Sequence, residues 1–225
     1  ENASLMPWLA GTALIHSLLV LKIKNKMQNW TALLAIMTFS LSLLGTFLVR
    51  SGILNSVHAF ANDPDRGVFI LVIIFFITTV SLLIYIFCSS NTSNNKISFF
   101  SKENFLNINN LFLLFFLFII LLGTIYPIIF SAFGGTISIG PDYYNTILAP
   151  FIFIFLIAMT IGPILKWSRN IGLKDIYFLS AVFFTALIIS LLIIFFTKRN
   201  ELILYLGLAS SLVLILTILF EIYQI

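Results

Sequence analysis

The chain of 225 residues contains two histidines, and they lie in different kinds of segment. His16 lies inside the apolar stretch GTALIHSLLV, which is long enough with its flanks to cross a bilayer. An ionisable side chain at such a depth should face protein and have a partner. Neutral imidazole is also a common axial ligand of haem iron. His16 is therefore interpreted either as a haem ligand or as a packed histidine hydrogen-bonded to a neighbouring helix.

The second histidine, His58, lies in the polar stretch RSGILNSVHAFANDPDRG. Ile53, Val57 and Phe60 recur at helical spacing there, which predicts a short amphipathic helix along the membrane interface. His58 is then either a haem ligand at the membrane surface or a solvated loop histidine. Because His16 is within a span and His58 is in a loop, the two would bind different haems if both bind haem.

Three further side chains are candidates for contact with a flat anionic ligand. Arg50 and Arg66 bracket the His58 stretch, and they are interpreted either as partners of haem propionates or as interfacial anchors. Trp8 is interpreted either as an aromatic-belt residue or as a wall of a haem site. No residue is assigned a catalytic role.

The composition predicts that these residues are held by membrane-spanning helices. Hydrophobic residues make up 60% of the chain and charged residues 9%, whereas soluble domains carry about 25% charged residues. The net charge of +4 is dispersed and gives no indication of nucleic-acid binding. A single cysteine, Cys88, excludes an internal disulfide and covalent c-type haem attachment to this chain. The predicted fold class is an all-α polytopic integral membrane protein.

About seven apolar segments are long enough to cross about 30 Å of hydrocarbon. They are predicted at Leu5–Leu21, Trp30–Val49, Val68–Cys88, Asn110–Phe130, Ile147–Ile164, Ile176–Phe196 and Leu202–Glu221. We treat residues 1–225 as one transmembrane domain. Since the chain starts with Glu1 and has no signal peptide, it is expected to be a piece of a longer protein.

Orientation follows from the distribution of Lys and Arg among the connections. The first, third and fifth connections are richer in basic residues than the second, fourth and sixth. The N-terminus is therefore predicted to face outward. Two outer loops follow, at about residues 50–67 and 131–146.

Two stretches resemble a known family. ENASLMPWLAGTALIHS, and LLGTFLVRSGILNSVHAFANDPDRGVFIL after it, are similar to the CcmF family, the haem-lyase component of the system I pathway of cytochrome c maturation. The resemblance covers residues 1 to about 75, and GPILKW at 162–167 extends it more loosely. The family's tryptophan-rich motif would lie upstream of Glu1.

The resemblance implies roles for both histidines. His16 matches the family's axial ligand of a stably bound transmembrane haem b. His58 matches an axial ligand of haem in transit, which the haem chaperone CcmE delivers to the outer face. The partner ligands would lie outside this chain. The implied reaction transfers haem from CcmE to apocytochrome c, with CcmH/CcmI-type subunits handling the apocytochrome.

The resemblance also implies a place in the cell, which is the bacterial inner membrane, with the mitochondrial inner membrane as the alternative. Two other functions remain open. One is a non-haem ion or proton transporter subunit in which His16 relays protons. The other is a different haem-handling protein of the tryptophan-rich-motif group.

Overall fold

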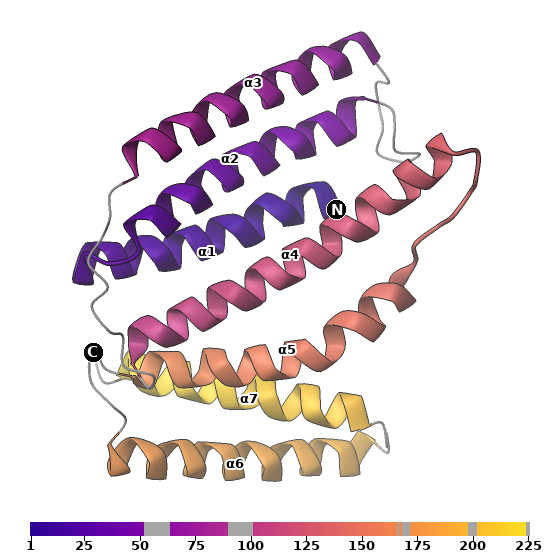
Figure 1. Cartoon of the computed structure of the whole chain (residues 1–225). Helices are drawn as coiled ribbons and strands as arrows, with labels where there is room; N and C mark the ends of the chain where they lie inside the picture. Colours follow the sequence, from indigo (N-terminus) through magenta and orange to yellow (C-terminus); the bar gives the residue numbers. More distant parts are fainter. Residues whose placement is uncertain (52–63, 90–100, 166, 168–171, 198–201, 224–225) are drawn as a thin grey trace. The chain divides into compact units, whose positions relative to one another are not determined.

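The computed structural model describes residues 1–51, 64–89, 101–165, 167, 172–197 and 202–223, and it is all-helical within them (Figure 1). The all-α prediction is confirmed, and each predicted apolar segment lies on a helix. The helices are α1 (Asn2–Lys24), α2 (Gln28–Arg50), α3 (Pro64–Cys88), α4 (Lys102–Ala132), α5 (Pro141–Ile164), α6 (Leu173–Thr197) and α7 (Leu202–Tyr223).

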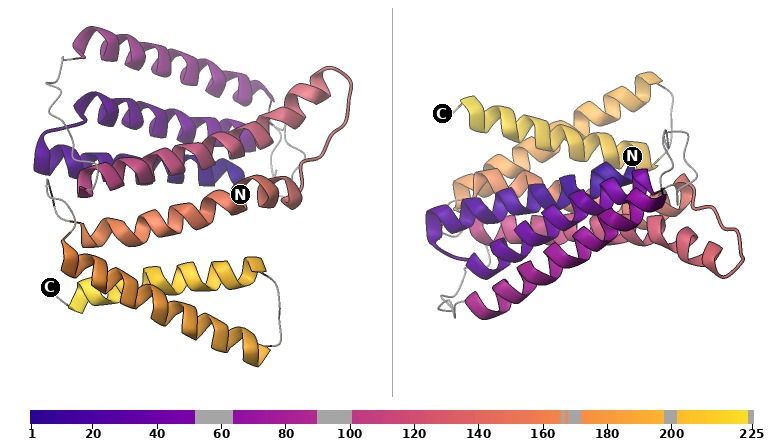
Figure 2. Two further views of the ribbon diagram at one scale, coloured as in Figure 1. Left: turned by 60° about the horizontal axis from the view of Figure 1, so that its bottom comes forward. Right: turned by 90° about the horizontal axis from the view of Figure 1, so that it is seen from above.

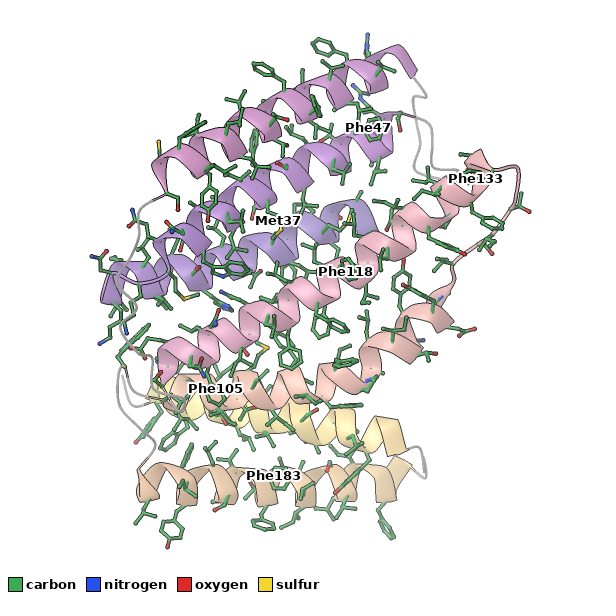
Figure 3. The ribbon with its side chains drawn as sticks, viewed as in Figure 1. Met37, Phe47, Phe105, Phe118, Phe133 and Phe183 are labelled. Carbon is green, nitrogen blue, oxygen red and sulfur yellow. The ribbon has the colours of Figure 1, made fainter. Side chains whose placement is uncertain are left out.

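Six of the described helices, α1 to α6, are long and apolar enough to cross a membrane. In α7 the apolar stretch among the described residues, Tyr205–Phe220, is shorter. Phenylalanine side chains line these helices (Figure 3). Phe118 and Phe183 are 54% and 46% exposed, whereas Phe105 is 7% exposed. Large exposed apolar side chains on most of the described helices are typical of a surface that faces lipid.

The chain divides into two compact units. The first unit contains Glu1–Asn94 and Asn110–Ile147, and the second contains Asn95–Asn109 and Leu148–Ile225. Helices α4 and α5 therefore contribute to both units. That residues 1–225 form a single transmembrane domain stays a prediction.

Helix α4 begins earlier than the apolar pattern predicts, at Lys102 instead of Asn110. Ser101 provides the start, because its hydroxyl accepts a hydrogen bond from the Asn104 backbone N–H at 3.4 Å and its carbonyl accepts one from Phe105. Serine in this position is a typical helix N-cap. A prediction that is based on hydropathy alone does not include the polar first turns of α4.

The connection between α4 and α5 is shorter than the predicted loop of residues 131–146. Gly134 has a φ of 82°, and the Gly135 N–H donates to the Phe130 carbonyl, which ends α4. Helix α5 then begins at Pro141 with Asp142 in its first turn. Proline at the first helical position and an acidic residue beside it both favour a helix start.

In the first unit, α1 and α2 lie side by side (Figure 2). Most of their buried residues follow one another at spacings of three, four or seven, the pattern of closely paired helices. A hydrogen bond of 3.0 Å joins the hydroxyls of Thr31 and Ser17. The buried residues are Met6, Leu9, Ala10, Ala13, Ser17 and Val20 on α1, and Thr31, Leu34, Leu41, Gly45 and Leu48 on α2.

The closest approach of these two helices is at Gly45. A Cβ atom added there would lie 2.5 Å from the backbone oxygen of Ala3. At Gly11, by contrast, an added Cβ would meet the Thr38 Cγ2 at 3.6 Å, which is ordinary contact. Glycine at position 45 therefore sets the distance between the start of α1 and the end of α2.

We expect Gly45→Ala to destabilise the protein by about 1–3 kcal/mol, the usual range for overpacking. Gly11→Ala is the matched control, because both changes gain the same helix propensity, about 1 kcal/mol, and only the first adds a clash. Thermal unfolding in detergent, followed by circular dichroism, compares the two variants. Equal unfolding temperatures would contradict the close α1–α2 contact.

In the second unit, α6 packs on α7. The Phe178 and Phe220 rings stack with centroids 3.9 Å apart, beside the buried residues Val182, Ala186 and Val213. At the start of α4, the Lys102 Nζ donates to the Pro163 carbonyl at 3.2 Å, in the last turn of α5. A lysine at a helix C-terminus satisfies a carbonyl that has no partner within the helix.

Candidate functional site

His16 lies on α1 and is paired with a residue of α4. Its Nδ1 is 3.0 Å from the Oδ1 of Asn110, which is 1% exposed. The sequence predicts that a histidine within a span has a partner, and Asn110 is that partner. Because the bond engages Nδ1, the hydrogen-bonded histidine and the haem ligand are not mutually exclusive interpretations of His16.

Asn110 has a polar atom that its surroundings do not satisfy. Its Nδ2 is buried and has no hydrogen-bond partner among the described residues. A buried donor left without a partner costs about 1–3 kcal/mol. The stability of the helix pair therefore does not by itself explain an asparagine in this position.

A second polar contact joins α1 to α4 near the start of α1. The Asn2 Nδ2 donates to the Thr124 Oγ1 at 3.1 Å and to the Tyr144 hydroxyl at 3.0 Å. Between Asn2 and His16, α1 rises about 21 Å at 1.5 Å per residue. Two polar contacts at this separation fix both the register and the rotation of α1 against α4.

Gly123 makes room for the tyrosine that completes this contact. A Cβ atom added at Gly123 would lie 2.6 Å from the Tyr144 hydroxyl and 3.0 Å from the Tyr143 Cε1. The sequence suggests only that these tyrosines mark a membrane interface. That Tyr144 reaches Asn2 is a feature that sequence reasoning misses, because it depends on how three helices pack.

The two arginines lie at the ends of helices that meet. Arg50 ends α2, Arg66 is in the first turn of α3, and both are exposed. A Cβ atom added at Gly67 would lie 3.0 Å from the Cα of Ser51, so the end of α2 contacts the start of α3. The two predicted arginines therefore lie beside the contact between the end of α2 and the start of α3.

Arg50 also lines a groove of about 510 Å³ between the start of α1 and the end of α2. The other lining residues are Ala3, Ser4, Pro7, Ser42, Gly45, Thr46 and Val49. Trp8 is 63% exposed, as expected for either an aromatic-belt residue or a wall for a ligand. His58 and its predicted interfacial helix lie outside the described residues. In the part of the chain that the structure describes, no three of the His, Cys, Asp and Glu side chains gather as a metal site would require.

Comparison with known proteins narrows the class of protein to which this chain can belong. The family model described as "Cytochrome C assembly protein" matches residues 1–54, the segment that contains His16. CcmF of Pseudomonas fluorescens is 46% identical over 169 residues, which is 75% of this chain and 26% of that protein. CcmF of Escherichia coli is 43% identical over 195 residues, 86% of this chain and 30% of the relative.

CycK of Bradyrhizobium diazoefficiens is 49% identical over 174 residues, 76% of this chain and 26% of its own length. The solved structure titled "Cytochrome c Heme Lyase CcmF" matches the fold with a TM-score of 0.73 at 22% identity. That match covers all of this chain and 33% of the solved chain.

The fold, with its helices long enough to cross a membrane, and the matched segment define a multi-pass membrane protein of the cytochrome c assembly class. Within that class, the chain belongs to the CcmF family. It spans about a quarter of the length of the relatives that it matches. The resemblance in the sequence to the CcmF family is confirmed.

Proposed function

We propose that the protein acts in cytochrome c biogenesis, where it binds haem and transfers it to apocytochrome c as part of a haem lyase. The observation that carries this proposal is identity of 43–49% to CcmF and CycK proteins over most of the chain. These relatives are named as cytochrome c-type biogenesis proteins, and the solved neighbour is named as a haem lyase.

In this proposal His16 is an axial ligand of a transmembrane haem b. The residues fit the group, because Asn110 engages the Nδ1 of the ring and the other nitrogen, Nε2, remains for the iron. When bound, the haem supplies a one-electron redox centre. The chain supplies the ligand nitrogen, its orientation, and an apolar surrounding that excludes water.

The outer-side residues serve haem in transit. His58 is proposed as an axial ligand of the haem that CcmE delivers, Arg50 and Arg66 as partners of its propionates, and Trp8 as a wall for its flat face. Both arginines are exposed and lie beside the contact between the end of α2 and the start of α3, and Arg50 also lines the groove between α1 and α2. These positions support the proposed pairing with propionates. CcmH/CcmI-type subunits would present the apocytochrome c.

The proposed location is the bacterial inner membrane, since the similar proteins come from bacteria. The start of α1, the end of α2 and the start of α3 would then face the periplasm. This orientation follows from the excess of Lys and Arg in the connections on the opposite side.

Reporter fusions test this orientation. Fusions at Lys24 and Lys174 are expected to behave as cytoplasmic, because these residues belong to the basic connections. Fusions at Asn62 and Gly135 are expected to behave as periplasmic. Activity of an alkaline phosphatase and of a fluorescent protein, each fused at the same four sites, gives complementary readouts. Finding Lys24 and Asn62 on one side would contradict the assignment of α2 as a span.

The function is tested by inactivating the gene and staining membranes for covalently bound haem. We expect c-type cytochromes to disappear and to return when the gene is supplied again. Haem covalently bound to CcmE should accumulate, because its acceptor is missing. Unchanged c-type cytochromes would exclude the proposed function, and a transporter would then be the better interpretation.

A further inference from the structure

We propose that Asn110 is a positioning residue, whose amide oxygen holds His16 with a proton on Nδ1 and so presents Nε2 to the haem iron. This inference rests on the proposed function, which makes His16 a haem ligand. It concerns a residue of the chain that neither touches the iron nor reacts.

The hydrogen bond determines which ring nitrogen carries the proton. The Asn110 Oδ1 is a carbonyl oxygen and accepts hydrogen bonds without donating. At 3.0 Å from it, the His16 Nδ1 must therefore be the donor. A neutral imidazole has one N–H, so Nε2 then carries the lone pair that a metal requires. The opposite tautomer would protonate Nε2 and block it.

Hydrogen bonds between α1 and α4 keep this geometry in place. Asn110 is 1% exposed, and Ala13 and Ser17 on the turns next to His16 are fully buried. Asn2 ties the same two helices together at Thr124. The protein itself therefore fixes the orientation of the imidazole, as a metal ligand requires.

The hydrogen bond to His16 distinguishes Asn110 from its neighbour Asn109. The Asn110 Nδ2 and the Asn109 Oδ1 are both buried without a partner among the described residues, and each costs stability. A leucine would fill a similar volume without burying a donor. The amide is thus explained by what its oxygen does at His16.

The tautomer is measured directly by ¹⁵N imidazole NMR of the full-length protein in detergent, prepared free of haem. The His16 signals are assigned by their loss in His16→Ala, and the sample is studied at alkaline pH where the ring is neutral. We expect a protonated Nδ1 and an unprotonated Nε2. Asn110→Leu should shift the population toward protonated Nε2, whereas Asn109→Leu, which changes the next buried asparagine on α4, should leave it unchanged. A protonated Nε2 with Asn110 present would overturn the proposal.

The second arm uses the full-length protein and follows haem. Asn110→Leu is expected to weaken haem binding by roughly 10- to 100-fold, the usual effect of removing a partner of a metal-bound histidine. Asn110→Asp keeps an acceptor and should retain haem with a more negative midpoint potential, because a stronger acceptor makes the imidazole a stronger donor. Asn109→Leu is again the control and should match the unmodified protein.

The outcomes separate the two proposals. Normal haem content and midpoint potential in both Asn110 variants, with haem absent from His16→Ala, would overturn the positioning role alone. A full haem spectrum in His16→Ala would overturn the ligand assignment, and the haem part of this inference with it. If Asn110→Leu does not assemble in the membrane, the midpoint potential of the haem in Asn110→Asp tests the positioning role, and an unchanged potential would overturn it.

Discussion

Replacement of His58 by alanine is expected to stop cytochrome c maturation and to leave the transmembrane haem b in place. His58 is predicted to lie in an outer loop, outside the span that holds His16, so the loss of one should not disturb the other. If His58 is the proposed ligand, its loss would leave incoming haem without the orientation that transfer requires. Haem should then accumulate on its carrier.

The result is measured by haem staining for mature cytochrome c, run beside the optical spectrum of membranes that contain the full-length variant. Added imidazole should restore part of the activity, because it occupies the vacated ligand position in an otherwise intact site. Normal maturation in the variant would exclude His58 as a ligand. Loss of the haem b spectrum would show that the roles of the two histidines are exchanged.

Replacement of His16 by alanine is expected to abolish the b-type spectrum of the full-length protein. The change removes the nitrogen that is proposed to bind haem, and it leaves the Asn110 oxygen buried and without its donor. A buried acceptor without a donor costs about 1–3 kcal/mol, which the remaining α1–α2 contacts should tolerate. The protein should therefore still reach the membrane.

The reduced spectrum of the purified variant, normalised to protein, measures this effect. Imidazole added during purification should restore a six-coordinate spectrum. Immunoblotting of membranes serves as the control for assembly. An unchanged reduced spectrum would mean that His16 is a packing residue and that the hydrogen bond to Asn110 is its whole role.

Hydropathy predicts the order of the described helices because a bilayer requires long apolar segments. Each predicted span coincides with a helix, from α1 to α7. The ends of the helices are less predictable, since caps and not apolar residues determine them. Ser101 starts α4 within a polar stretch, and Pro141 starts α5 before the apolar run begins.

The candidate site, like the fold, can be predicted from the sequence only in part. The position of His16 inside an apolar span predicts that it needs a partner, and this follows from the energetics of a single side chain. The identity of the partner depends on which residues of α4 face α1, and the interhelical register decides that. Asn110 gives one signal in the sequence, an amide at the start of an apolar run. Only the packed helices show that it meets His16 and that Asn2 meets Thr124.

The central claim is that the protein binds haem through His16, and the absorption spectrum of the purified full-length protein tests it most directly. Reduction with dithionite should give the sharp bands of a six-coordinate b-type haem, and the pyridine haemochrome should identify haem b that organic solvent extracts. Both signals should be absent from His16→Ala purified in parallel. A full-length protein that is folded, present in the membrane and without haem absorption would contradict the claim.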